Sequence, residues 1–403
     1  MRRCDASSFL SAASNAMAWM VLLLAMFPVR HCISKELVFV HVIYRHGARS
    51  PSRVYPNDPH KSHWHFGWKQ LTKIGMKQQH DLGQFLRQRY IEDTPLLSKE
   101  YKRDELYVRS SNKDRALQSA QSTLAGLYPP INTNYWEDRL PIHGFLPARH
   151  DLLLKPTSVD CPVYDHKLKK HLKRVFRHYN RKYRDFFELF KSRTGVDGDI
   201  GIKEVAKYGY GPINSEKTEG LPVPWVDEPW TGTDSDKYPT IWLLIKEMKR
   251  VVEVSDFDRR ELAKFKGGYL LNDMLHRMNQ KTTGKEKRPT KMTMYSSHQG
   301  TLQALMHNMR ISDSQLLPYS SCLMIELYRY DSGEHGVEVY LRNNSALPPF
   351  QLTLPPCKNL FGICPLDLVQ RFYADSVYRS QEEAMSACEC GIQSVKVKVK
   401  DSA

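Results

Sequence analysis

The sequence lacks the signatures of several common protein classes. It has no low-complexity block and no internal repeat, so nothing indicates a repeat architecture. No strand-like run is followed by G-x-G-x-x-G, and no Walker A spacing occurs, which excludes the usual dinucleotide and P-loop sites. The cysteines lack zinc-finger spacing and no basic helix has interleaved aromatics, so no nucleic-acid partner is expected. His63 and His65 are more typical of a surface loop than of a ligand set, and we expect neither a metal nor another cofactor.

The residues that are present suit a globular core with a basic surface. Of the 403 residues, 41% are hydrophobic and 11% are aromatic, enough for one large domain or two of ordinary size. The formal net charge is +15. Such a surface suits anionic substrates, although nucleic acid or a membrane surface would suit it as well. The charges from Lys167 to Arg184 are more typical of a solvated helical face.

Residues 1–34 have the pattern of a signal peptide. Arg2 and Arg3 precede the twelve apolar-rich residues 16–27, a length typical of a signal-peptide core and short for a membrane span. An uncleaved anchor stays open as an alternative. No second apolar run lies near the C-terminus, so we expect a lumenal or secreted chain with no stable membrane span after cleavage.

Three stretches have the pattern of a strand, a polar loop and a helix, which favours an α/β fold. The strands are expected over 37–44, 105–108 and 291–295, and the helices over 72–89, 113–127 and 301–309. Residues 322–330 and 337–342 read as two further strands joined by a hairpin turn, Asp331-Ser332-Gly333. We expect a three-layer α/β/α sandwich with a mostly parallel mixed sheet and an inserted, mainly helical cap domain.

The first of these loops carries the densest group of candidate functional residues. It reads Arg45-His46-Gly47-Ala48-Arg49-Ser50-Pro51, directly after the buried strand. Guanidinium groups bind phosphate or carboxylate with two parallel hydrogen bonds, and a neutral imidazole between them could attack phosphorus. Taken alone, arginine and histidine after a strand are often only a solvated loop. The three residues together indicate a site for phosphoryl transfer.

The extended string Arg45-His46-Gly47-x-Arg49-x-Pro51 resembles the signature of the histidine acid phosphatases. Residues 35–37, 70–90, 107–130 and 294–309 are similar to the prostatic and lysosomal types of that family, and the resemblance covers most of 35–390, with the middle third weakest. It implies a secreted or lysosomal enzyme that hydrolyses small phosphomonoesters without a cofactor, and because relatives are often homodimers, a homodimer is expected.

The resemblance also implies roles for individual residues. His46 is expected to be the nucleophile that forms a phosphohistidine. Arg45, Arg49, Arg109 and His298 are expected to bind the phosphate. For Arg109 the argument is its context, Val108-Arg109-Ser110-Ser111-Asn112-Lys113-Asp114-Arg115, since a lone arginine after a strand usually has a structural explanation.

The sequence departs from the family at Gln299. The family has an acid after the second histidine, and that acid protonates the leaving alkoxide. A glutamine cannot give up a proton, so we expect reduced activity, greatest for alkyl phosphates. The alternative is a pseudophosphatase that binds anions without meaningful turnover.

Six cysteines follow residue 34, which fits an oxidising compartment. The resemblance implies that Cys357 pairs with Cys364, and Cys161 with either Cys388 or Cys390. The family's partner for Cys322 is absent, so Cys322 is expected to be free or paired with the remaining cysteine. The sequon Asn343-Asn344-Ser345 makes Asn343 a candidate glycan site.

These observations predict a division of the chain into domains. Residues 1–34 form the signal peptide, and 35–138 with 263–375 form the α/β core. Residues 139–262 form the inserted helical cap domain, and a disulfide ties down the tail, 376–403.

Overall fold

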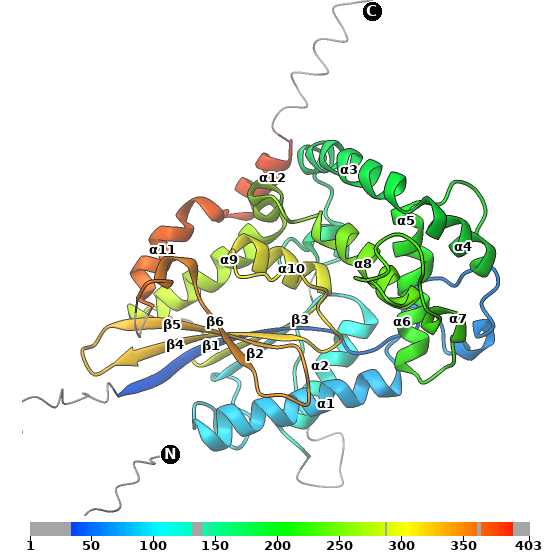
Figure 1. The fold of residues 1–403 in the computed structure, drawn as a ribbon. Helices are drawn as coiled ribbons and strands as arrows, with labels where there is room; N and C mark the ends of the chain where they lie inside the picture. Colours follow the sequence, from blue (N-terminus) through cyan, green and yellow to red (C-terminus); the bar gives the residue numbers. More distant parts are fainter. Residues whose placement is uncertain (1–33, 131–139, 145, 287, 361–363, 390–403) are drawn as a thin grey trace, which may run out of the picture.

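A computed structural model describes residues 34–130, 140–144, 146–286, 288–360 and 364–389 (Figure 1). The predicted signal peptide lies outside these residues except for Ser34. Among the helices described, none has the length and apolarity to cross a membrane.

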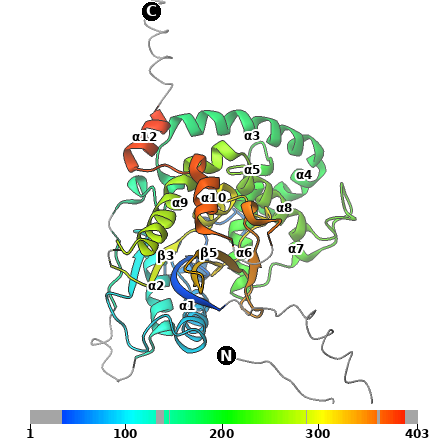
Figure 2. The ribbon, with the colours of Figure 1, turned by 90° about the vertical axis from the view of Figure 1, so that its left-hand side faces the viewer.

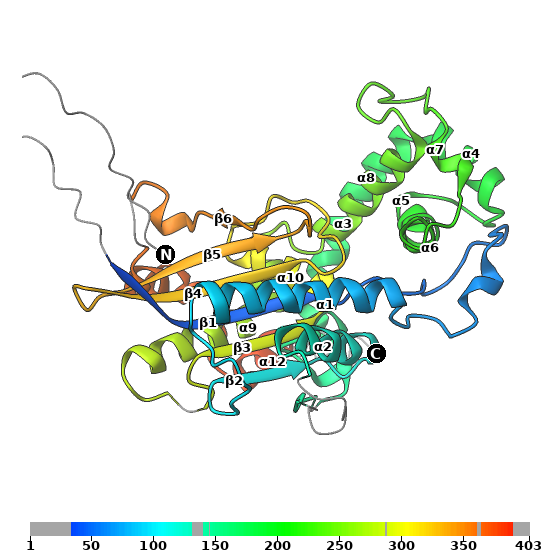
Figure 3. The ribbon, with the colours of Figure 1, turned by 90° about the horizontal axis from the view of Figure 1, so that it is seen from below.

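One mixed sheet of six strands organises the described part of the chain, in the order β2-β3-β1-β4-β5-β6 (Figure 3). Strands β2, β3 and β1 pair in parallel, and the other three pairings are antiparallel. Four of the six strands therefore run in the same direction. The strands span Lys35–Arg45 (β1), Leu106–Ser110 (β2), Met292–Ser297 (β3), Cys322–Tyr330 (β4), His335–Arg342 (β5) and Phe350–Leu352 (β6).

Helices cover both faces of this sheet because both faces of the central strands are apolar. On β1, Val40 and Val42 pack toward α1 and α2, whereas Phe39 and Ile43 pack toward α9, α10 and α11. Figures 1 and 2 show these two helical layers on opposite sides of the strands. The expected three-layer α/β/α sandwich is confirmed. The layers consist of α1 (Lys73–Arg87) and α2 (Asp114–Leu127), and of α9 (Arg260–Thr282), α10 (Gln299–Asn308) and α11 (Leu366–Tyr373).

The middle third of the chain is helical and has a hydrophobic cluster of its own. Phe186, Phe190 and Ile245 belong to that cluster, and Tyr55 joins it from the loop after β1. The character of this region agrees with the predicted cap, whose boundaries stay a prediction. Its helices are α3 (Pro162–Lys182), α4 (Arg184–Thr194), α5 (Ile202–Glu204), α6 (Gly211–Thr218), α7 (Pro224–Asp227) and α8 (Ile241–Val254).

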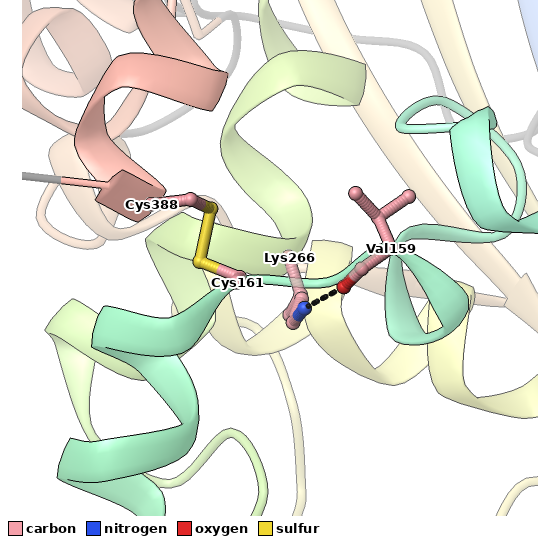
Figure 4. Close-up of a disulfide and its surroundings, with 4 residues drawn as sticks. All are labelled: Val159, Cys161, Lys266 and Cys388. Atoms are coloured by element: carbon pink, nitrogen blue, oxygen red, sulfur yellow. Dashed lines mark hydrogen bonds between the residues drawn. A yellow bond between two sulfur atoms is a disulfide. The ribbon is translucent and has the colours of Figure 1, made fainter.

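Two disulfides agree with the expected pairings. Cys161 bonds Cys388, which joins the start of α3 to α12 (Gln381–Glu389), and Cys357 bonds Cys364. Close to the first disulfide, the buried Lys266 donates a 3.0 Å hydrogen bond to the carbonyl of Val159 (Figure 4). This bond and the disulfide together fix the segment that leads into α3.

Three further sequence predictions concern single residues. Cys322 is buried and free within the described part of the chain, and Cys390, the cysteine that Cys161–Cys388 leaves over, lies outside the described residues. Asn343 directly follows β5 and is half-buried, and its glycan stays a prediction.

A buried pair of carboxyl groups joins the loop after β1 to α6. Asp58 and Glu216 are 4% and 0% exposed, and burial, followed by the neighbouring carboxyl group of Asp58, raises the pKa of Glu216 to about 9. The folded protein therefore retains a proton that the unfolded chain releases above its ordinary pKa of 4.5. This contribution to stability is complete below that value and is lost as the pH rises toward 9.

We expect Glu216→Gln to remove this pH dependence. The free energy of unfolding of the wild type should fall between about pH 5 and pH 8 by up to about 1.4 kcal/mol per pH unit, the limit for one proton. The variant should show a flatter profile in urea unfolding. Glu188→Gln, at an exposed acid on α4, is the matched control. Parallel profiles for all three proteins would contradict the assignment.

Candidate active site

The loops after the parallel strands meet at one edge of the sheet. Arg45, the last residue of β1, lies beside Ser297, the last residue of β3. Beyond the strands, the amide of His46 donates to the carbonyl of Ser297, and the amide of Ser111 donates to that of Ser296, both at 3.1 Å. Open α/β sheets bind their ligands at this edge. The predicted nucleophile, His46, lies there beside the end of β3.

The position of His46 defines which ring nitrogen can react. The side chain is 4% exposed, and its Nδ1 lies 2.9 Å from the carbonyl oxygen of Gly47. A carbonyl only accepts hydrogen bonds, so Nδ1 carries the proton and Nε2 keeps the lone pair. A Cβ at Gly47 would lie 2.2 Å from the carbonyl oxygen of Gly75 on α1, so only glycine allows this packing.

The surroundings of His46 keep its ring neutral. Burial lowers the pKa of His46 well below 6.5, and the nearby guanidinium of Arg115 lowers it further. Arg45 and Arg49 act in the same direction with smaller effects, and the hydrogen bond to Gly47 opposes them. The imidazole is therefore favoured in its neutral form, in which Nε2 is unprotonated and nucleophilic.

Arg45 and Arg49 are held beside this imidazole. The Arg45 guanidinium lies 4.2 Å from the centroid of the Tyr319 ring, and its Nη1 donates to the carbonyl of Leu317. The Nε atoms of Arg45 and Arg49 are buried and have no hydrogen-bond partner in the described part of the chain. These two buried N–H donors without a partner are suited to bind an anion.

The structure does not place Arg109 with this group. Arg109 lies inside β2, not in the loop after it. Leu106 and Val108 of the same strand pack toward α1 and α2, so strand alternation turns Arg109 to the opposite face. There its Nη2 lies 3.5 Å from Oδ1 of the buried Asp151. The geometry thus shows an ion pair for Arg109, and its contact with phosphate stays a prediction.

Arg115, which was not expected to bind phosphate, lies beside the second histidine of the site. It lies in the first turn of α2, with Nη2 3.4 Å from Nδ1 of His298. Burial, followed by the charges of Arg49 and Arg45, lowers its pKa to about 10. A signal was present in the sequence, because a cation in the first turn of a helix opposes the helix dipole and needs another reason to be there.

His298 forms the second imidazole of the site. Its ring centroid lies 5.4 Å from that of His46. Because Arg115 can only donate, Nδ1 of His298 accepts, and the Nε2 proton is donated to the Ser111 hydroxyl at 2.7 Å. Burial, followed by the charge of Lys155, lowers the pKa of His298 well below 6.5. Ser111 and Arg115 therefore hold this ring in a defined, neutral state.

Gln299 takes the position at which the sequence departs from the family. It is the first residue of α10 and is 8% exposed. Its Nε2 is buried and finds no hydrogen-bond partner among the described residues. An amide can donate a hydrogen bond to a leaving oxygen but cannot transfer a proton to it.

A cavity of about 780 Å³ adjoins the site. Arg45 and Tyr319 line it on the side of the sheet, and Tyr210, Asn214 and Lys246 line it on the side of the helical region. It is large enough for the organic part of a small ester.

Comparisons with known proteins show what the chain is similar to. The sequence model of the histidine phosphatase superfamily (branch 2) matches residues 36–184 and 165–342. Lysosomal acid phosphatase of Bos taurus is 36% identical over 350 residues, which cover 83% of this chain and 76% of that protein. Prostatic acid phosphatase of Bos taurus is 32% identical over 410 residues, covering 97% of this chain and 98% of its own. Among solved structures, the apo form of Hafnia alvei phytase has the same fold, with a TM-score of 0.64 and 18% identity over 88% of this chain and 98% of its own.

Proposed function

The chain belongs to branch 2 of the histidine phosphatase superfamily, and from that premise we propose that it hydrolyses phosphate monoesters through a phosphohistidine on His46. The observation that carries the proposal is the state of this ring: it is neutral, its Nδ1 proton is held by Gly47, and arginines surround it. The named relatives, acid phosphatases of the lysosomal and prostatic types, support the same reaction class.

The first step forms a bond between Nε2 of His46 and phosphorus while the bond to the ester oxygen breaks. The ring gains positive charge as it is phosphorylated, and the Nδ1–H bond to Gly47 then becomes charge-assisted. Arg45, Arg49 and Arg115 offset the charge on the equatorial oxygens. In the second step, water attacks phosphorus, the P–N bond breaks, and neutral His46 and inorganic phosphate are released.

An acidic pH preference follows from the substrate as well as from the enzyme. A phosphomonoester monoanion carries a proton that can help the leaving group, which matters more where the acid of the family is a glutamine. The second pKa of a phosphomonoester is about 6. His46 stays neutral over the same range because its pKa is depressed.

Gln299 leads us to propose reduced turnover, greatest for esters with poor leaving groups. General acid catalysis contributes about 10²–10⁴-fold to such reactions. The alternative function, a pseudophosphatase that binds phosphate without turnover, is favoured by Gln299 alone. The geometry of His46 and its three arginines favours the enzyme.

The deciding measurement compares two substrates at about pH 5, below the second pKa of the ester. We expect p-nitrophenyl phosphate to be hydrolysed readily and glycerol phosphate to be hydrolysed more slowly, with kcat/KM falling as the pH rises above about 6. Equal rates would mean that Gln299 is no deficit. No turnover of either ester, with vanadate still bound, would establish the pseudophosphatase.

We also propose that the protein acts in the lysosome or outside the cell on small phosphomonoesters. Two disulfides and the names of the relatives support this setting. A homodimer and the absence of a nucleic-acid partner stay predictions.

A further inference from the structure

The loop from Leu154 to Thr157 is fastened against the residues around Gln299. The carbonyl of Leu154 accepts a hydrogen bond from the Ser297 hydroxyl at 3.0 Å and from the Thr301 hydroxyl at 2.8 Å. These two donors lie on either side of His298 and Gln299 in the sequence. A Cβ at Gly300 would lie 3.0 Å from Cγ2 of Thr157, so the loop also touches the first turn of α10.

Lys155 is the cation that this loop presents at the site. Its Nζ donates to Oγ1 of Thr157 at 3.2 Å, and Thr157 lies against the first turn of α10, which begins with Gln299. After burial, Lys155 has the largest effect on the pKa of His298, larger than that of Arg115. Lys155 is therefore one of the charges that act on the second imidazole of the site.

The charges that face Lys155 make it a stronger acid than an ordinary lysine. Burial lowers its pKa to about 8, and Arg115, Lys113 and Arg49 act in the same direction. The acid that opposes them is Glu253 of α8. Lys155 is therefore charged in acid, yet parts with a proton more readily than a lysine in water.

The nearby carboxyl groups are less suited to donate a proton. Glu253 bonds Lys249, and the charges of Lys249, Arg45 and Lys155 hold its pKa below the ordinary value of 4.5, so it is ionised at the pH at which the enzyme is expected to act. Asp151 adjoins the same loop, and burial raises its pKa, but its Oδ1 accepts the amides of Leu153 and Leu154 and pairs with Arg109.

We propose that Lys155 supplies the proton that the leaving oxygen needs, in place of the acid that Gln299 has replaced. The inference rests on the proposed function. As the ester P–O bond breaks, the Nζ proton moves to the leaving oxygen, which departs as an alcohol and leaves a neutral amine. The amine then takes a proton from the water that attacks the phosphohistidine, which returns Lys155 to its charged form.

The test is the dependence of kcat/KM on the leaving group, which reports the first step alone. The wild type, Lys155→Met and Lys155→Arg are compared on p-nitrophenyl, phenyl and glycerol phosphate. Arginine keeps the charge but cannot transfer a proton to the leaving oxygen, since its pKa lies above about 12. We expect both variants to lose about 10²-fold on glycerol phosphate and less than about 3-fold on the p-nitrophenyl ester.

A double variant separates proton transfer from anion binding. In Gln299→Asp, a carboxyl group returns to the site, so adding Lys155→Arg should cost little on glycerol phosphate. Retained vanadate binding by Lys155→Arg shows that the pocket has folded. Equal losses on all esters would reduce Lys155 to a binding cation, and no loss would remove it from the reaction; either result overturns this inference alone. A wild type that turns over no ester would overturn the inference together with the proposed function.

Discussion

Replacing His46 by alanine is expected to lower kcat for p-nitrophenyl phosphate by at least about 10³-fold, because the variant lacks the atom that bonds phosphorus. The second ring of the site, His298, is not free to replace it, because its Nδ1 is used toward Arg115 and its Nε2 toward Ser111. Binding of vanadate should persist, since the arginines remain. Initial rates at about pH 5 and vanadate titrations measure the two effects separately.

A trapping experiment tests directly whether His46 forms the covalent phosphohistidine. With ³²P-labelled substrate and an alkaline quench, the wild type should retain label and His46→Ala should not. His65→Ala is the matched control, since His65 is exposed and bonds the carbonyl of His63. If His46→Ala kept its turnover, or if the label persisted in it, another residue would have to be the nucleophile.

The core strands could be predicted from the sequence because their burial pattern is strong. The expected strand over 37–44 is β1, Lys35–Arg45, and the expected hairpin is β4 and β5 with the turn between them. Strand β6 was not predicted: it has three residues and follows Pro348 and Pro349, so neither length nor alternation identifies it. The sequence also gave no sign of the buried Asp58–Glu216 pair, because Asp58 and Glu216 meet only through the tertiary fold.

In the candidate site, too, residues that share one loop could be predicted, whereas contacts that depend on the tertiary fold could not. His46 and its flanking arginines could be predicted because they share one loop, where the identity of the residues already indicates their chemistry. Arg109 and Arg115 both follow the start of the same strand, and choosing between them requires knowing where β2 ends and which way its side chains alternate. A strand end placed at Val108, two residues too early, put Arg109 in a loop that β2 still occupies.

Substitutions at Arg109 and Arg115 test which of the two arginines binds the phosphate. We expect Arg115→Ala to lower kcat/KM for p-nitrophenyl phosphate by about 10²–10³-fold, the usual cost of removing a donor aimed at a developing charge. Arg109→Ala should leave kcat/KM within about 3-fold and instead lower the stability by about 1–3 kcal/mol, because Asp151 would stay buried without its partner.

Three measurements distinguish the two roles of these arginines. Competition by inorganic phosphate should weaken in Arg115→Ala and stay unchanged in Arg109→Ala. The free energy of unfolding in urea should fall in Arg109→Ala and stay unchanged in Arg115→Ala. Arg115→Lys keeps a charge in the first turn of α2 but loses the two-pronged contact with phosphate, so it should recover only part of the rate. If Arg109→Ala instead weakened phosphate binding while Arg115→Ala did not, the residue expected from the sequence would be the true ligand. The ion pair with Asp151 would then have to break when phosphate binds.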